Sequence, residues 1–326
     1  MADDQLSGSR EPILRLGISS CLLGEKVRYD GGHKLDRFLV EVLGKFVEWE
    51  PVCPEIEIGL SIPRESMRLM GNPDAPRLVA PKSGTDHTNR MTTWAQSRLE
   101  ALATRDLSGF VFKKDSPSSG LFRVKVYNEH GMAERTGSGL FARAVRDRFP
   151  LLPLEEEGRL NDLPLRENFI ERIFAHYRWM ELVKTDPTPG GLVRFHTAHK
   201  LTLMAHSPKH YTEMGRLVAK AGTLPWEELQ ETYGRLFMEG LTLLGTRRKH
   251  VNVLQHLMGY LKKDLSIEDK QELLGLIEDY RQELVPLIVP MTLLKHHLRR
   301  HKVPAWVWQQ VYLSPYPREL MLRNHV

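Results

Sequence analysis

The chain of 326 residues is 41% apolar and 27% charged, which suffices for two globular cores and excludes a chain that is disordered throughout. Its longest apolar run, residues 284–294, contains two prolines and is shorter than the roughly 18 to 20 residues that span a bilayer, so no membrane partner is expected. Residues 1–160 hold 23 basic and 23 acidic side chains, so the net charge of +5 belongs to residues 161–326. This excess is compatible with an anionic partner, although ordinary basic surfaces carry as much.

The polar N-terminal residues 1–10 are not followed by an apolar stretch with a small-residue cleavage site. This pattern predicts no secretory signal and a cytoplasmic location. Two cysteines in so long a chain exclude a disulfide framework, and a reducing compartment leaves both thiols free for metal or redox chemistry.

The first half alternates short apolar runs, rich in β-branched or aromatic residues, with helical patterns. This alternation predicts an α/β domain of the Rossmann-like kind, with a parallel sheet covered by helices. Strands are expected at residues 13–19, 46–52 and 109–112, helices at 34–46, 88–103 and 139–149, and an extended segment at 151–155.

The second half reads as helical almost throughout. An acidic run at residues 155–157 gives way to Pro164, which suits the opening of a helix, so we predict one domain over 11–160 and an all-α domain over 161–326. Helices are expected at 168–183, 192–206, 211–221, 226–244, 251–263, 267–284 and 292–300.

The residues directly after three predicted strands carry the chemistry of the first half. Ligands bind outside the carboxyl ends of the strands of an open parallel sheet, so the three loops are expected to meet at one crevice. Cys21 and Cys53 would then lie close together; the alternative is two unrelated buried cysteines, since free cysteine is among the most buried residue types. The loops are Ser19-Ser20-Cys21-Leu22-Leu23-Gly24, Val52-Cys53-Pro54-Glu55 and Ser116-Pro117-Ser118-Ser119-Gly120.

These loops, with Val27-Arg28-Tyr29-Asp30-Gly31 and the segment 123–127, resemble the signature of the thiouracil desulfurase family over residues 13–157. In that family three cysteines hold a 4Fe-4S cluster and leave one iron without a protein ligand. The resemblance implies that this iron, a soft Lewis acid, takes the sulfur of the substrate. Water then attacks the polarised carbon, and no electron is transferred.

The resemblance also implies roles for polar side chains. Glu55 matches the position of the family's proposed acid/base group, and its alternative role is that of a surface or loop-capping carboxylate. Ser116 and Ser118 lie where a hydroxyl relays protons or bonds the leaving sulfur, although serines are common in tight loops. Arg28 and Arg64 are further candidates for substrate binding.

The sequence departs from the family at the third cluster position. The family carries Ser-Pro-Ser-Cys-Gly there, and this chain has Ser119 in place of the cysteine. A neutral hydroxyl is a poor iron ligand beside a thiolate, so a 4Fe-4S cluster held by Cys21 and Cys53 alone is expected to be labile or absent. An engineered change, a natural variant that recruits another ligand, and a lineage that lost the chemistry all remain open.

Eleven of the fourteen histidines lie in the second half, and His196, His199 and His206 fall within about 80° on one helix face. Such a stripe suits a metal, or the phosphate of a substrate, whereas the alternative is a packing face with satisfied imidazoles; no HExxH-type pair is present. This half is similar to a family of uncharacterised domains that occur behind desulfurase-like domains, and the similarity assigns no activity.

The sequence therefore predicts a desulfidase that hydrolyses a thiolated pyrimidine, as the free base or a thiouridine nucleotide. The helical domain is expected to close over the crevice and to supply cations to a phosphate. The competing hypothesis is a catalytically impaired, cluster-free relative that binds a nucleotide, RNA or another protein.

Overall fold

The structure of the chain, a computed structural model, describes residues 14–325. The chain divides into two compact units between Arg159 and Leu160, one residue before the predicted boundary. That the two units are independent domains stays a prediction. The first residue of the strand predicted at 13–19 and the polar segment 1–10 lie outside the described residues.

The first sheet of the first unit consists of β2 (Val47–Val52), β1 (Leu14–Ser19), β5 (Leu107–Phe112) and β8 (Leu154–Glu156), in that order. All three pairings are parallel, and β1 pairs with β2 without a register shift. All residues of β5 are buried, as expected for a parallel strand covered on both faces. The carboxyl ends of β1, β2 and β5 therefore meet at one edge of the sheet.

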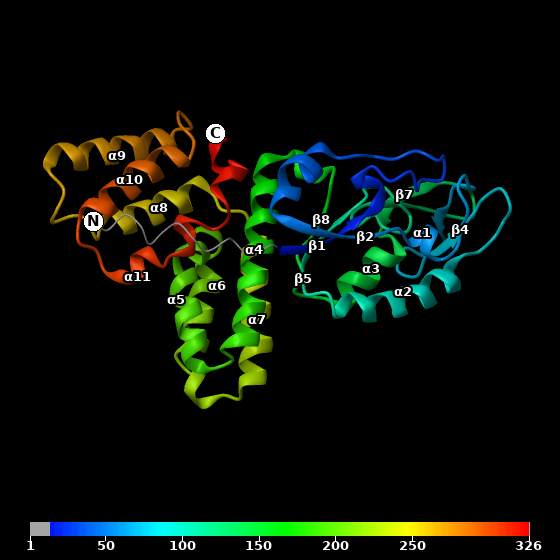
Figure 1. Cartoon of the computed structure of the whole chain (residues 1–326), viewed down its shortest axis with the longest axis horizontal. Coiled ribbons are helices and arrows are strands. Elements are labelled where there is room, and N and C mark those ends of the chain that lie inside the picture. Colours follow the sequence, from blue (N-terminus) through cyan, green and yellow to red (C-terminus); the bar gives the residue numbers. More distant parts are fainter. Residues whose placement is uncertain (1–13, 326) are drawn as a thin grey trace. The chain divides into compact units, whose positions relative to one another are not determined.

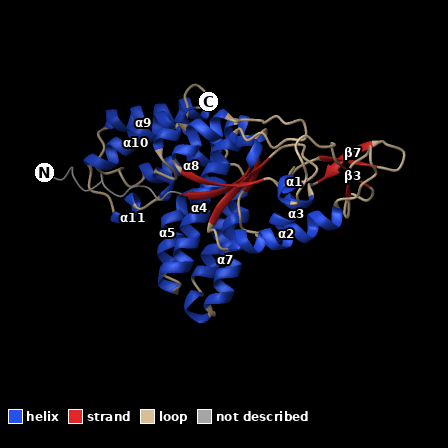
Figure 2. Cartoon of the chain, turned by 45° about the vertical axis from the view of Figure 1, so that its right-hand side comes forward, coloured by secondary structure: helices blue, strands red, loops and turns tan. Residues whose placement is uncertain are grey.

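The core of this unit lies between the sheet and the helices α2 (Thr88–Ala103) and α3 (Leu140–Arg148), which run side by side in both views (Figures 1 and 2). Phe110 and Phe112 of β5 stack with ring centroids 4.2 Å apart, and Phe141 of α3 meets both rings edge-on. A side chain at Gly17 in β1 would overlap the Phe110 ring, so this central strand requires glycine there.

A second sheet was not predicted. It consists of β4 (Arg77–Val79), β3 (Arg68–Met70), β6 (Val124–Tyr127) and β7 (Ala133–Gly137), and β3 and β7 lie apart from the first sheet in Figure 2. Two of its pairings are antiparallel and one is parallel. Its strands are three to five residues long, and four of the five residues of β7 are exposed, so the alternation in β6 is too short and β7 too exposed to be recognised in the sequence.

The helix predicted at residues 34–46 is wrong. The segment forms a π-helical turn at Phe38–Val42 and a 3-10 turn at Leu43–Lys45, without a regular α-helix. Only Leu39 and Leu43 of its apolar residues are buried, whereas Val40 and Val42 are exposed. The apolar pattern that suggested a helix therefore does not face a core, and two β-branched residues disfavour a regular helix.

The second unit is helical, which confirms the predicted fold class of an α/β domain followed by an all-α domain. Pro189 opens one helix and Pro208 the next, each behind a side-chain cap, Thr188 and Ser207 respectively. No helix among residues 14–325 has the length and apolarity needed to cross a membrane. The helices are α4 (Leu163–Thr185), α5 (Pro189–His206), α6 (Pro208–Val218), α7 (Trp226–Thr242), α8 (Arg247–Met258), α9 (Ile267–Arg281), α10 (Ile288–Arg300) and α11 (Ala305–Trp308).

Candidate active site

The loops after β1, β2 and β5 line one cavity of about 400 Å³ at the carboxyl edge of the first sheet. Its walls include Cys21, Cys53 and Ser119, although these residues are far apart in the sequence. The parallel topology produces this convergence, because the carboxyl ends of parallel strands point the same way.

Cys21 lies in a 3-10 turn, Ser20–Leu23, that follows β1 directly. The turn ends at Gly24, whose φ of 94° suits glycine and whose N–H donates to the Cys21 carbonyl at 3.3 Å. The side chain of Cys21 is 8% exposed, and burial raises the pKa of its thiol to about 11 although Lys113 acts in the opposite direction. The thiol is therefore protonated at neutral pH.

Cys53 follows β2 and precedes the short helix α1 (Pro54–Glu57). Its backbone N–H donates to Glu57 Oε1 at 3.1 Å, which fixes the turn, and its thiol donates to Glu55 Oε2 at 3.5 Å. Burial, followed by the negative charge of Glu55, raises the pKa of this thiol to about 12. A metal ion that binds Cys21 and Cys53 must therefore displace a proton from each.

The third loop, residues 116–120, is held from two sides. Glu156 at the end of β8 accepts hydrogen bonds from the N–H groups of Leu121 and Phe122 at 2.8 and 3.0 Å. On the other side, a Cβ at Gly139 would lie 2.5 Å from the Ser118 carbonyl, so glycine allows the start of α3 to approach the loop. Ser116 and Ser119 line the cavity, whereas Ser118 is fully buried and is not in its wall.

A chain of hydrogen bonds joins this loop to Glu55. The Ser118 hydroxyl donates to Glu55 Oε1, the hydroxyl oxygens of Ser116 and Ser118 are 2.9 Å apart, and the Ser119 N–H donates to Ser116 Oγ at 3.1 Å. Glu55 thus lies between the Cys53 thiol and a pair of hydroxyls. A carboxylate in contact with hydroxyl groups beside a solvent-filled cavity is suited to accept and return a proton.

Cationic side chains also line this cavity. Arg28 and Arg64, both predicted, are in the wall, and Arg64 Nη1 is buried without a hydrogen-bond partner among residues 14–325. Sequence reasoning missed Lys34, Lys113 and Lys114, which are also in the wall. The last two follow β5 directly, so the strand-end argument that selected the cysteines would have found them.

The predicted histidines lie on α5 of the second unit and face its interior. The His196 ring stacks on Tyr211 with its Nδ1 3.2 Å from the Tyr233 hydroxyl, and His199 Nδ1 lies 2.8 Å from the Phe195 carbonyl. His206 is buried and bonds Glu171 at 3.0 Å. These contacts match the alternative of a packing face, and the described residues hold no group of three or more His, Cys, Asp or Glu suited to a metal ion. A role of these histidines in substrate binding stays a prediction.

The donor set does not fit a cluster held by three thiolates. Cys21 and Cys53 offer two soft sulfur ligands at the cavity, but the third position offers the hydroxyl of Ser119. Soft thiolates are the ligands that iron-sulfur clusters select, and a hydroxyl is a weaker ligand for them. Cys21 and Cys53 are therefore the two thiol donors in the wall of this cavity, and metal binding by them stays a prediction.

The fold and the site together define a parallel α/β unit with a thiol-bearing crevice at the carboxyl edge of its sheet, followed by a helical unit. The profile of the 2-thiouracil desulfurase family matches residues 16–157, and that of the family described as "Protein of unknown function (DUF1722)" matches residues 200–317. The chain therefore carries a domain of the 2-thiouracil desulfurase family followed by a domain of the DUF1722 family.

Two curated relatives each match about half of the chain. YbgA, an uncharacterised protein of Escherichia coli (strain K12), is 32% identical over 156 residues, which are 47% of this chain and 90% of YbgA. YbbK, an uncharacterised protein of Bacillus subtilis (strain 168), is 30% identical over 155 residues, which are 45% of this chain and 97% of YbbK. Among solved structures, a 4Fe-4S-dependent thiouracil desulfidase named TudS is 26% identical with a TM-score of 0.39, covering 48% of this chain and 99% of TudS.

Proposed function

We propose that the first unit removes sulfur from a thiolated pyrimidine by hydrolysis. The match of residues 16–157 to the 2-thiouracil desulfurase family supports a thiolated pyrimidine as the substrate. The observation that supports hydrolysis is the position of Glu55, which is held between the Cys53 thiol and the Ser118 hydroxyl at the cavity. The oxygen of water bonds to the thiocarbonyl carbon, the carbon-sulfur bond breaks, and the sulfur leaves as hydrogen sulfide without a change of oxidation state.

In this proposal Glu55 is the general base that accepts a proton from the attacking water and the acid that returns it to the leaving sulfur. Ser118 and Ser116 hold the carboxylate and extend the hydrogen-bonded path. The site acts on a free base or a nucleotide, and the second choice is supported by the cations of the wall, above all the unpartnered Nη1 of Arg64. A phosphate in a partly dehydrated cleft gains more from such cations than it does in water.

Ser119 itself favours a second function. With two thiols and a hydroxyl, the cavity is suited to binding a thiolated base or nucleotide, or an RNA that carries one, without turnover. The two functions differ in a single measurable quantity, the release of sulfide.

The test is anaerobic production of the chain and of Ser119→Cys, followed by iron and sulfide analysis and an assay of sulfide released from 2-thiouracil and 4-thiouridine monophosphate. Thiolate is the better ligand, so the cysteine variant is expected to hold more iron, and to release sulfide about tenfold faster or more. If neither protein holds iron or releases sulfide, the desulfurase function fails for this chain. Titration with the same ligands then decides whether the binding function holds.

A further inference from the structure

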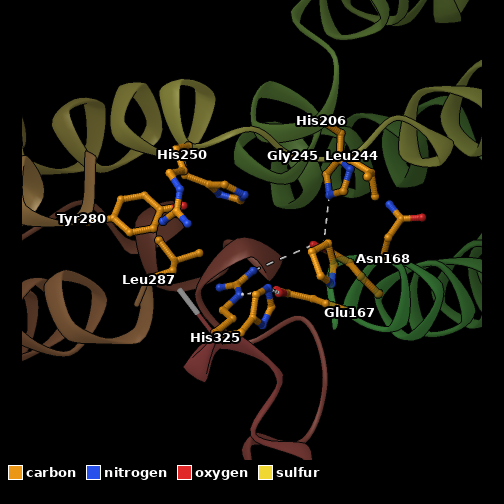
Figure 3. Close-up of a pocket in the computed structure, with 13 residues that line it drawn as sticks. Glu167, Asn168, His206, Leu244, Gly245, His250, Tyr280, Leu287 and His325 are labelled. Atoms are coloured by element: carbon orange, nitrogen blue, oxygen red, sulfur yellow. Dashed lines mark hydrogen bonds and ion pairs between the residues drawn. The ribbon is translucent and has the colours of Figure 1, made fainter. Parts of the chain in front are cut away.

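The helical unit contains a cavity of about 190 Å³ that the proposed reaction does not use. It is enclosed by α4, the segment after α7, the helices α8 and α9, and the C-terminal segment, where Leu322–Asn324 forms a 3-10 turn. Figure 3 shows Glu167 beside His325 on one side, His250 near Tyr280 on another, and His206 near Asn168 on a third. Apolar side chains of Leu244 and Leu287 complete the wall.

The carboxylates around this cavity each have a basic partner in its wall. Glu171 and His206 form a buried pair at 3.0 Å, and Arg323 Nε lies 3.2 Å from Glu167 Oε1. Burial acts to lower the pKa of His206, but Glu171 outweighs it and the pKa is raised, while burial lowers the pKa of His250 to about 3. Both carboxylates therefore already have a basic partner in the wall. Arg247 at the cavity is paired with Glu283 at 3.0 Å.

This balance excludes the simplest ionic ligands. An anion would meet the carboxylates of Glu167 and Glu171, and a cation would meet the guanidinium of Arg323. Each would lose hydration without a matching gain, since a buried charge requires a partner of opposite sign that is not already paired. A neutral ligand that both donates and accepts hydrogen bonds fits the wall better.

Two buried polar atoms of the wall lack hydrogen-bond partners among residues 14–325. They are Glu171 Oε1, an acceptor, and Arg323 Nη2, a donor, which form a long ion pair with each other at 4.0 Å in residues that are only 5% and 7% exposed. The remaining atoms of both groups are engaged: Glu171 Oε2 with His206, Arg323 Nη1 with the Tyr312 carbonyl at 2.7 Å. A separation of 4.0 Å is too long for a hydrogen bond, so a molecule that bridges these two atoms would supply the hydrogen bond that each lacks.

A carbonyl oxygen next to an N–H on the same edge of a molecule satisfies both atoms at once. An ordinary secondary amide is trans and directs these two groups to opposite sides, whereas the ring of a cyclic amide holds them on one side. A six-membered ring also suits a cavity of this volume, with Leu244 and Leu287 against its faces or edges.

We propose that this cavity binds a small neutral cyclic amide whose carbonyl oxygen accepts from Arg323 and whose N–H donates to Glu171, as one edge of a pyrimidine base such as uracil would. This site belongs to the helical unit and does not depend on the reaction of the first unit. The competing occupant is water, since a water molecule also bridges a 4.0 Å gap and the volume holds several.

The requirement for an N–H on the ligand is tested on the full chain by calorimetric titration with uracil and with 1,3-dimethyluracil. The dimethyl compound keeps the ring and the carbonyls but has no N–H, so it is expected to bind about tenfold more weakly or worse. Equal affinities, or no binding of uracil, would overturn the proposal.

Location is tested by Glu171→Gln, which replaces the acceptor with an amide of the same shape, and by Glu278→Gln as the matched control on the surface of α9. The first is expected to weaken uracil binding about tenfold or more and the control to leave it unchanged. Full uracil affinity in Glu171→Gln would place the ligand elsewhere and overturn the proposal.

Should Glu171→Gln not fold, diffraction from crystals of the unchanged chain soaked in uracil decides between a planar ring in the cavity and water only. Neither readout uses sulfide release, so failure here is distinct from failure of the desulfurase function.

Discussion

Glu55 is the residue whose replacement separates binding from proton transfer. Glu55→Gln keeps the size of the side chain and a hydrogen bond to Ser118 but removes the base, so the release of sulfide is expected to fall by about 10² while thiouracil affinity is retained. Glu48→Gln, at an exposed surface ion pair with Arg15, is the matched control and should behave like the unchanged chain. Unaltered turnover in Glu55→Gln would remove this carboxylate from the mechanism.

His176 on α4 makes the stability of the helical unit depend on pH. It is 6% exposed, its Nδ1 has no hydrogen-bond partner among residues 14–325, and burial lowers its pKa to about 4 from an ordinary 6.5. Between these values the unfolded chain takes up a proton that the folded chain does not, so the free energy of unfolding decreases as the pH falls. The full loss, reached below pH 4, is about 3 kcal/mol.

His176→Leu removes this contribution. Urea unfolding is expected to show a variant whose advantage over the unchanged chain grows from pH 7 to pH 5, by about 2 kcal/mol. His130→Leu, at an exposed position of the first unit, is the control for the substitution itself. A difference between His176→Leu and the unchanged chain that stays constant over this range would contradict the argument.

At the residue scale, sequence reasoning found side chains whose position follows from topology. Cys21, Cys53 and Ser119 line one cavity because each follows a parallel strand. The same reasoning did not resolve the histidines of α5, because a polar stripe and a packing face share the period of 3.6 residues. The pairing of His206 with Glu171 links residues 35 positions apart on two helices, and no local pattern encodes such a contact.

Among the helices, the packing of α7 on α4 is set by a glycine. A Cβ at Gly234 would lie 2.9 Å from Trp179 Nε1 and 3.1 Å from Cε2 of the same ring. Because the Trp179 side chain is fully buried, Gly234→Ala must push the two helices apart, at a cost of about 1–3 kcal/mol. Thermal unfolding should show a lower midpoint for this variant.

Gly275 in α9 is the matched control, because a Cβ there meets nothing within 4 Å. The same change at this open helical position is expected to raise stability by about 0.5–1 kcal/mol, since alanine loses less backbone entropy than glycine on folding. Opposite signs for the two substitutions confirm close packing at Gly234; a rise in both would show that α7 accommodates the methyl group.

Elements with a clear period were predictable and those that depend on tertiary pairing were not. The helix predicted at residues 88–103 matches α2, whose Met91, Ala95, Leu99 and Leu102 are all buried on one side. The second sheet escaped prediction because β3 and β4 have three residues each and are stabilised by pairing with neighbours rather than by their own pattern. The segment 34–46 shows the converse case. Its apolar residues have helical spacing, but few of them are buried, and the helix predicted from that spacing does not form.

At the scale of the whole molecule, the net charge is distributed unevenly between the two halves of the chain. The first half is balanced and the second carries the net charge of +5, while the cations of the crevice belong to the first unit. The relatives YbgA and YbbK are each covered almost completely by about half of this chain. Relatives of about half this length thus exist as separate proteins, and that residues 1–160 fold alone is a prediction.

We expect the intact chain to bind 4-thiouridine monophosphate more tightly than 4-thiouridine, by about tenfold at low salt, because a phosphate forms charge-assisted contacts with cations such as Arg64. The positive charge of the helical unit predicts that this unit adds to the preference. Residues 1–160 alone will then show a smaller ratio of the affinity for 4-thiouridine monophosphate to that for 4-thiouridine. The preference for the phosphorylated ligand should shrink between about 0.01 and 0.15 M salt, as the screening length falls from about 30 to 8 Å.

Uncharged 2-thiouracil is the control ligand and should bind both proteins alike. A truncated unit that keeps the full preference for the phosphorylated ligand would show that the crevice cations suffice, and the positive charge of the helical unit would then require a different anionic partner.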